Sequence, residues 1–187
     1  MPKIVNHEEY KRELLSNSYE VFAKKGYSAL TMRDLAKSLK VSTGTLYHYF
    51  PSKLELFEQL VVLIAERDIS KIASIVKVSQ STEEKLDLIF DYLEQIEPEC
   101  QKQMLIMIDA LRELGTEEAG KVSGFERADN IYMKGMCELF DLDDDTSIFL
   151  GCVINGLVIE RMINPSQVSI QAQKKFILQI LKMNKKF

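Results

Sequence analysis

The sequence predicts an all-α fold, with an N-terminal three-helix bundle that contains a helix-turn-helix, followed by a larger helical domain. Gly and Pro number only 8 and 4 among 187 residues, which disfavours all-β folds because those need many turns. Apolar residues recur at intervals of three and four along most of the chain, the spacing of amphipathic helices. Two short helical segments follow a longer one near the N-terminus, which is the order of a helix-turn-helix.

The first helix is predicted between Asn6 and Gly26. Asn6 and Glu9 have the spacing of a capping box, which satisfies free backbone N–H groups at a helix start. Gly26 follows Lys24 and Lys25, and a glycine there can take the positive φ that ends many helices.

Two short helices come next. Thr31 and Asp34 begin one that ends near Lys40, and Ser42 caps another that Pro51 closes. The second helix of such a unit enters the DNA major groove with its first residues foremost. Small, polar residues at this point would let the backbone approach a phosphate closely, and the chain has four of them: Ser42, Thr43, Gly44 and Thr45.

Only helices are predicted after Pro51. A long amphipathic helix runs from Ser52 to about Val76. Further helices are expected from Ser81 to Pro98, over 100–114, over 122–140 and over 146–163, and a last one begins at Asn164–Pro165. The predicted domain boundary follows Ser52 and divides the chain into residues 1–52 and 53–187.

The charge distribution favours a nucleic-acid partner for the N-terminal part alone. The whole chain has a net charge of −4, but residues 1–60 carry nine Lys/Arg and seven Asp/Glu. Within residues 24–53 there are six basic residues and one acid, Asp34. A local basic surface on an acidic protein can bind DNA without coating it indiscriminately.

The cysteines and histidines do not suggest a metal site, and no cofactor is expected. Cys100, Cys137 and Cys152 are widely spaced, and the only histidines are His7 and His48. The odd number of cysteines and the lack of a signal peptide favour reduced thiols in the cytoplasm. The uncharged run 146–159 is shorter than the roughly 20 residues of a membrane span, so no membrane contact is expected.

A dense pattern of residues between Gly26 and Phe57 resembles the DNA-binding domain of the TetR/AcrR family of bacterial transcriptional regulators. The pattern covers about the first third of the chain and comprises Gly26-Tyr27, Thr31, residues 33–36 (Arg-Asp-Leu-Ala), residues 41–47 (Val-Ser-Thr-Gly-Thr-Leu-Tyr), Tyr49-Phe50, Ser52-Lys53 and Leu56-Phe57. The family has Ile where this chain has Leu35, and it often has Ala-Gly where this chain has Leu39-Lys40. Lys40 could add a phosphate contact.

The resemblance implies roles residue by residue. Contacts to phosphate are expected from Thr31, Ser42, Tyr47, Tyr49 and Lys53. Contacts to base edges are expected from Thr43, Gly44 and His48, and Arg33 and Thr45 complete the expected interface. Tyr47 could instead be a core tyrosine, although Leu46 and Phe50 already supply an apolar face. His48 could instead be an ordinary solvated residue.

The resemblance also implies a function. The expected protein is a ligand-responsive repressor that binds a pseudo-palindromic operator in double-stranded DNA as a homodimer and is released by a small molecule. It is not expected to be an enzyme, because the chain has no nucleophile motif, phosphate loop or metal cluster. A helical adaptor protein is the other alternative, but it would not need this pattern of Thr31, Ser42, Gly44, Tyr47 and Lys53.

The second domain is expected to bind the ligand and to form the dimer. Residues that could line an adaptable apolar pocket, if they are not simply core, are Met104, Met107, Phe125, Tyr132 and Met133. Asp109 could orient a cationic ligand, or it could pair with Arg112 on a wet face.

The predicted helix 146–163 is apolar on more faces than one domain of this size could cover. Together with residues 166–183 it is expected to form the homodimer, with Gly151 and Gly156 allowing a partner helix to approach closely. The alternative is a buried central helix without a partner.

Overall fold

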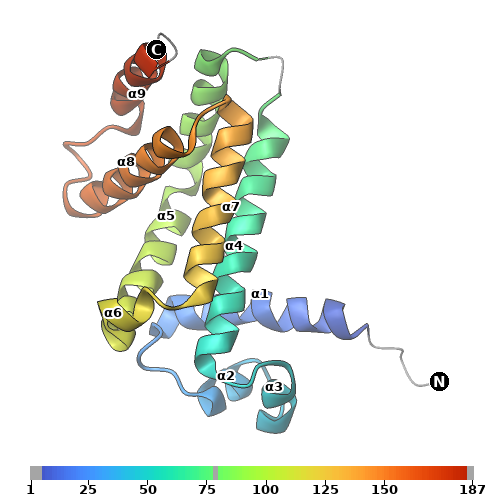
Figure 1. Cartoon of the computed structure of the whole chain (residues 1–187). Helices are drawn as coiled ribbons and strands as arrows, with labels where there is room; N and C mark the ends of the chain where they lie inside the picture. The colour runs from blue at the N-terminus through green and yellow to red at the C-terminus, as the bar shows by residue number, and fades with distance from the viewer. Residues whose placement is uncertain (1–5, 78–79, 185–187) are drawn as a thin grey trace. The chain divides into compact units, whose positions relative to one another are not determined.

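The computed structural model describes residues 6–77 and 80–184, and every regular element in these ranges is a helix (Figure 1). The predicted all-α fold class is confirmed. The chain divides into two compact units: unit 1 comprises Met1–Glu66 and Leu105–Ala128, and unit 2 comprises Arg67–Met104 and Asp129–Phe187. These units reflect packing, whereas the predicted boundary after Ser52 concerns function and stays a prediction.

Unit 1 begins with the three predicted N-terminal helices. They are α1 (His7–Lys25), α2 (Met32–Ser38) and α3 (Thr43–Tyr49), and α4 (Lys53–Ile75) begins directly after them. Figure 1 shows α2 and α3 side by side below α1. The predicted start signals are confirmed, because each side chain accepts a backbone N–H of the first turn that it precedes: Asn6 from Glu8 and Glu9, Thr31 from Asp34, Ser42 from Thr45 and Ser52 from Glu55.

Aromatic side chains form the centre of this unit. The ring centroids of Phe22 and Phe57 lie 5.3 Å apart, and those of Tyr27 and Phe57 lie 4.8 Å apart. Phe125 meets Phe57 edge-on at 6.1 Å. Such pairs contribute about 0.5–1.5 kcal/mol beyond the burial of their area. They therefore hold α1, the turn after it and the start of α4 as one body.

Unit 1 is completed by the end of α5, the short α6 (Thr116–Ala119), which was not predicted, and the start of α7 (Ser123–Phe140). Glu58 of α4 accepts hydrogen bonds from the Gly124 N–H at 2.8 Å and from the Ser123 hydroxyl at 3.1 Å. A Cβ atom on Gly124 would lie 2.7 Å from the Cα of Glu58. The two helices can approach this closely only because residue 124 is glycine.

Unit 2 contains most of α5 (Thr82–Leu114) and of α7, together with α8 (Asp144–Ile163) and α9 (Ile170–Asn184). Asp143 caps α8 by accepting the Thr146 N–H at 2.7 Å. The core gathers side chains from these helices and from the segment after α4. Its most buried members are Leu86, Phe90, Phe140, Leu150, Ile170, Ile177 and Leu181.

The predicted break at Pro98 is wrong, because α5 is continuous from Thr82 to Leu114 with Pro98 inside it. A proline removes one hydrogen bond of the helix ladder and costs about 3 kcal/mol. The helix buries Leu93 before the proline and Ile106 after it, and this packing offsets the loss.

The predicted start of the last helix is also wrong, since α9 begins at Ile170 and not at Asn164–Pro165. Asn164 ends α8, and its carbonyl accepts the N–H groups of Gln167 and Val168, which makes a turn. The Ser169 hydroxyl then accepts the Ala172 N–H at 3.2 Å and so begins α9.

Helix α8 has the length and hydropathy of a membrane span, the only helix in the described ranges that does, although core helices of globular proteins often pass the same test. It carries charges near both ends, with Asp144 and Asp145 in its first turn and Arg161 in its last.

Candidate nucleic-acid interface

Helix α3 is anchored on one side and open on the other. Leu46 and Phe50 are completely buried, whereas Gly44 and His48 are exposed and Tyr47 is 49% exposed. The choice of a surface position for Tyr47 over a core position is therefore confirmed. The predicted base-reading positions lie on a helix that the core fixes in place.

Gly44 is not required by the packing of the free chain. Among the described residues, a Cβ atom at this position would meet only the Ser42 hydroxyl, at an ordinary distance of 3.7 Å. Glycine inside a helix is less stable than alanine by about 0.5–1 kcal/mol. The packing of the folded chain therefore gives no reason for a glycine at this position.

The turn between α2 and α3 is strained at Lys40. Its φ of 57° lies in the left-handed region that favours glycine. The Lys40 N–H donates to the Lys37 carbonyl at 3.2 Å, and the Val41 N–H donates to the Ala36 carbonyl at 3.0 Å. Glycine would adopt this φ without strain, so a role for the positive charge would explain why a lysine stands here. The Lys40 side chain is exposed beside α3.

Thr31 is already engaged in the free chain. Its hydroxyl donates to Asp34 at 2.5 Å, and it also accepts the Asp34 N–H at 3.2 Å. The hydroxyl bond and the Thr31 N–H together hold the pKa of Asp34 below its usual range. To donate to a phosphate, the Thr31 hydroxyl has to turn away from this carboxylate.

Lys53 is also engaged. Its Nζ donates to the Tyr27 carbonyl at 3.0 Å and lies 4.1 Å from the centroid of the Tyr27 ring. An ammonium group has three N–H donors, so two are left for a phosphate. Lys53 thus holds the turn after α1, whatever it contacts outside.

Tyr49 is held by residues that the sequence alone did not point to. Its hydroxyl lies 3.0 Å from Nδ1 of His7, and its ring packs edge-on against Tyr10 at 5.6 Å. The rings of His7 and His48 lie 6.3 Å apart. The start of α1 therefore supports the end of α3, a contact across 42 positions that helical spacing could not reveal.

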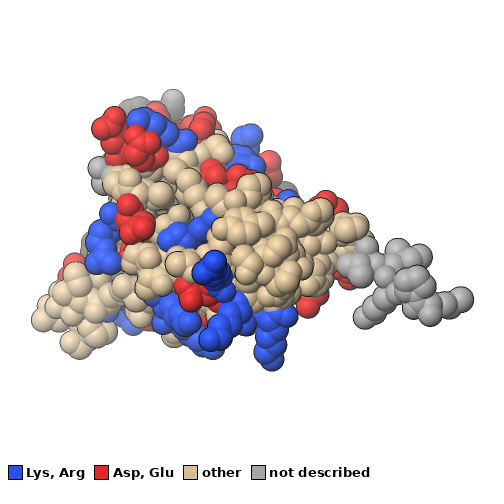
Figure 2. Space-filling view, turned by 90° about the horizontal axis from the view of Figure 1, so that it is seen from below, with Lys and Arg blue, Asp and Glu red and all other residues tan. Residues whose placement is uncertain are grey.

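Basic side chains gather on the surface of this region. Figure 2, which views the chain from below α2 and α3, shows Lys and Arg side chains close together on that face. Lys24, Lys25, Arg33, Lys37 and Lys40 are all exposed, in keeping with the charge pattern of the sequence. Their charges suit a phosphate backbone.

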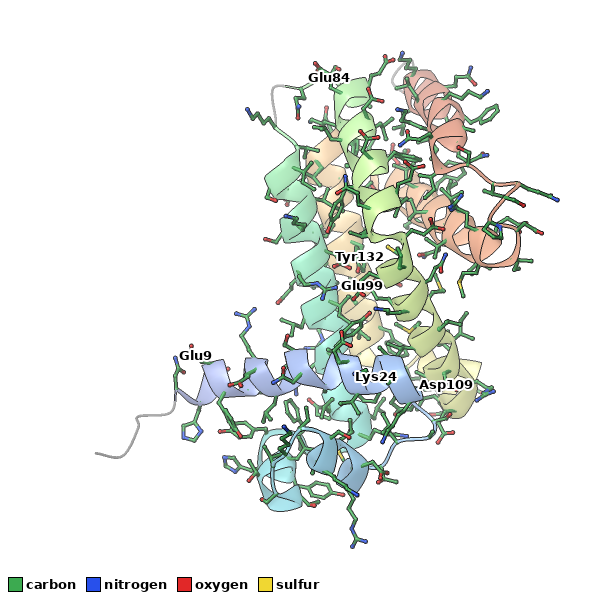
Figure 3. All side chains as sticks on the ribbon, turned by 180° about the vertical axis from the view of Figure 1, so that it is seen from behind. Glu9, Lys24, Glu84, Glu99, Asp109 and Tyr132 are labelled. Atoms are coloured by element: carbon green, nitrogen blue, oxygen red, sulfur yellow. The ribbon has the colours of Figure 1, made fainter. Side chains whose placement is uncertain are left out.

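The five predicted pocket residues do not share one unit. Met107 and Phe125 belong to unit 1, while Met104, Tyr132 and Met133 belong to unit 2. The Tyr132 hydroxyl donates to Asp68 at 3.0 Å, and burial raises the pKa of Tyr132 (Figure 3).

Unit 2 contains a half-open cleft of about 330 Å³ between α4 and α5. None of the five predicted residues lines it. Seven side chains line the cleft: Arg67, Asp68, Lys71, Tyr92, Ile96, Glu99 and Gln103. Four of them are charged, so the lining is more charged than that of the apolar cavity expected from the sequence. Burial, with the nearby charges of Asp68 and Glu99, raises the pKa of Cys100 to about 11. No group of His, Cys, Asp and Glu in the described ranges could hold a metal ion.

Comparisons with known proteins agree with this geometry. Residues 14–60 match the family model described as bacterial regulatory proteins, tetR family. The chain is 22% identical over 191 residues to the HTH-type transcriptional regulator PksA of Bacillus subtilis, covering 96% of this chain and 91% of PksA. It is 24% identical over 115 residues to IcaR of Staphylococcus aureus, a negative transcriptional regulator of the biofilm operon icaADBC, covering 61% of this chain and 60% of IcaR.

The fold is also found among solved structures. FadR of Bacillus subtilis in complex with stearoyl-CoA superposes with a TM-score of 0.62 at 20% identity, covering 91% of this chain and 96% of that protein. At this identity the likeness concerns the fold alone.

Proposed function

The chain belongs to the tetR family of bacterial regulatory proteins, and from this premise we propose that it is a repressor that binds a pseudo-palindromic operator as a homodimer and is released by a small molecule. That it is a transcriptional regulator and not an enzyme follows from its relatives. The sense of regulation is inferred from IcaR, which is a negative regulator.

The observation that carries the proposal is the open face of α3. A glycine that the fold does not need stands beside an exposed tyrosine and an exposed histidine, on a helix fixed by Leu46 and Phe50. In a helix-turn-helix such a face lies in the major groove, where Thr43, Gly44 and His48 would meet base edges. Phosphate contacts from Tyr47 and the surrounding lysines would set its register.

Replacing Gly44 by alanine is expected to separate stability from DNA binding. The variant should unfold at slightly higher denaturant concentration, because alanine is the better helix former by about 0.5–1 kcal/mol. Its DNA affinity should fall about ten-fold or more, since the added methyl group stands where the backbone approaches DNA. Urea denaturation and a binding titration at fixed salt measure the two effects.

Two further variants serve as controls for this experiment. Lys40→Gly should also stabilise the chain, by relieving the positive φ, but it should weaken binding to all DNA sequences alike and reduce the log–log salt slope by about 0.9. His48→Ala should instead change the sequence preference. A Gly44→Ala variant that keeps full DNA affinity would show that α3 does not approach DNA in this way.

The proposed dimer surface is an apolar stripe on α8 with a second one on α9. Exposed residues on α8 recur at intervals of four, four, three and four positions: Ile148, Cys152, Gly156, Ile159 and Ile163. Phe176 and Ile180 add exposed apolar groups on α9. Contiguous apolar patches of this kind mark interaction sites, and a pair of helices from each copy would make a four-helix interface.

Gly156 fits this role. Apart from the backbone of its own helix, a Cβ atom built on Gly151 or on Gly156 would meet no atom of the described residues within 4 Å, so the space around both glycines is open. A partner helix could use that space. The alternative of a buried central helix does not suit α8, because Ile163 is 67% exposed and Ile148 is 54% exposed.

The effector is proposed to bind in unit 2, and the cleft between α4 and α5 is the place for it. Its volume of about 330 Å³ is at the lower end of the range for small-molecule sites. A structural neighbour, FadR, was solved with stearoyl-CoA. The ligand would favour a conformer in which α4 tilts and the two α3 helices of the dimer no longer match successive grooves.

Linkage provides the test of this step. A ligand found by thermal-shift screening should bind the free protein about 5–150-fold more tightly than the operator complex, and DNA should be weakened by the same factor. Isothermal titration with and without operator measures both. Equal affinity for the two forms would exclude that ligand as the inducer.

A further inference from the structure

The turn between α1 and α2 carries the first part of the helix-turn-helix. It runs from Gly26, which has a φ of 77°, to Leu30, which is 2% exposed, and it leads directly into Thr31, the N-cap of α2. Whatever sets the conformation of this turn sets where α2 begins. Because α2 packs against α3, it also bears on the helix that is proposed to read DNA.

A carboxylate on a distant helix binds this turn. Asp109 of α5 accepts the backbone N–H of Ser28 at 2.8 Å, and it accepts the Ser28 hydroxyl at 3.0 Å on each oxygen. In the view of Figure 3, the label of Asp109 lies beside the C-terminal end of α1, near that of Lys24. Hydrogen bonds from an N–H to an ionised carboxylate are shorter and about twice as strong as neutral ones.

The carboxylate is ionised at neutral pH. The Ser28 N–H and hydroxyl, together with Arg112, hold the pKa of Asp109 below its usual range. The contribution of this contact to stability is therefore present above the unfolded pKa of an aspartate and is lost as the pH falls through the lower, folded pKa.

The absence of a side chain at Gly26 makes room for this carboxylate. A Cβ atom on Gly26 would lie 2.6 Å from Oδ2 of Asp109, closer than real contacts allow. Glycine at this position thus serves both the positive φ and the approach of Asp109. Lys53 holds the neighbouring residue, because its Nζ donates to the Tyr27 carbonyl. One charged group from α4 and one from α5 bind consecutive residues of the same turn.

The pairing with Arg112 does not explain this arrangement. The Arg112–Asp109 ion pair, one of the two alternatives expected for Asp109, is present at 2.7 Å. Its arginine is 76% exposed, and exposed pairs contribute little to stability. The Ser28 contacts span 81 positions and engage a backbone N–H, so they are what constrains the turn.

We propose that Asp109 is a positioning residue for DNA binding, holding the turn 26–30 in the conformation that places Thr31, α2 and α3 on DNA. This inference rests on the proposed function. Asp109 touches no DNA in this scheme and acts through Ser28.

The test compares Asp109→Asn with Arg112→Ala in the full-length chain. Asp109→Asn keeps the size of the side chain but replaces the charged acceptor, so the Ser28 amide should exchange with solvent faster and operator affinity should fall about ten-fold. Arg112→Ala removes the exposed partner and leaves the Ser28 contacts, so both quantities should stay near those of the wild type. Asp109→Glu should restore part of the affinity.

Each outcome decides the matter. Suppose that the wild type binds DNA and that the Asp109→Asn variant is folded by circular dichroism. Operator affinity equal to that of the wild type would then overturn the inference, and so would an unchanged rate of amide exchange at Ser28. If Asp109→Asn does not fold, Ser28→Ala takes its place: it removes only the hydroxyl bonds and should reduce affinity a few-fold, and full affinity would overturn the inference. A wild-type chain that binds no DNA would instead refute the proposed function.

Discussion

Replacing Arg161 by alanine is expected to lower the free energy of unfolding by about 1.5–3 kcal/mol, because the charge-assisted hydrogen bonds of a partly buried ion pair are lost. Arg161 of α8 donates two hydrogen bonds to Glu97 of α5, from Nε to Oε1 at 2.6 Å and from Nη2 to Oε2 at 2.7 Å. The two side chains are only 18% and 15% exposed. Arg161 also donates to the Val168 carbonyl and so holds the turn before α9.

The pH dependence of this loss follows from Glu97. Its hydrogen bonds with Arg161 hold its pKa below the usual range, so the stability that the pair provides is present above the unfolded pKa of a glutamate. This stability disappears as the pH falls through the lower, folded pKa. Wild type and Arg161→Ala should therefore differ most near neutral pH and converge in acid.

Urea denaturation at one fixed protein concentration measures the effect, because an oligomer gains apparent stability with concentration. The matched control is the double variant with Glu97→Met and Arg161→Met, which removes both charges and should recover most of the loss. An Arg161→Ala variant that is as stable as the wild type at neutral pH would show that the ion pair contributes nothing to the free energy of unfolding.

We expect the double variant Ile159→Glu with Phe176→Glu to be monomeric at micromolar concentration, where the proposed dimer should form. Each side chain is partly exposed in the single chain, at 39% and 50%. The stripes on α8 and α9 would place them against a second copy, where two buried, unpaired carboxylates face apolar surface. Losses of about 2–4 kcal/mol per central contact raise the dissociation constant by a factor of about 1000 or more.

Light scattering coupled to size exclusion measures the mass of wild type and variant. Leu105→Glu is the matched control, since Leu105 is also apolar and 55% exposed but lies on α5 in unit 1, and this variant should stay dimeric. A wild type that is monomeric at micromolar concentration would refute the dimer. A wild type that associates only with detergent or lipid would show that α8 meets a membrane instead.

Local chemistry explains which elements could be predicted. Asn6, Thr31, Ser42 and Ser52 each act within three residues of their own position, so these helix starts could be recognised from spacing alone. Pro98 misled for the same reason: its local effect is to end a helix, and only the burial of side chains on both sides of it keeps α5 intact.

The parts of the site that could not be predicted depend on residues far apart in the chain. The exposure of Tyr47 and His48 could be predicted, because it depends on their neighbours within one short helix. The support of Tyr49 by His7 and the hold of Asp109 on Ser28 join residues 42 and 81 positions apart. Periodicity does not carry such information. The five pocket residues stay a prediction, because in the sequence an apolar side chain looks the same whether it lines a cavity or fills a core.

Selection from a random pool of double-stranded DNA with the full-length wild-type chain shows whether the protein binds a specific operator as a dimer. We expect one motif to be enriched, with halves that are inverted repeats whose centres lie about 34 Å or somewhat more apart, and we expect it to be bound at least about 1000-fold more tightly than unrelated DNA. A pool that stays random after repeated rounds, or equal affinity for selected and unrelated DNA, would contradict this expectation.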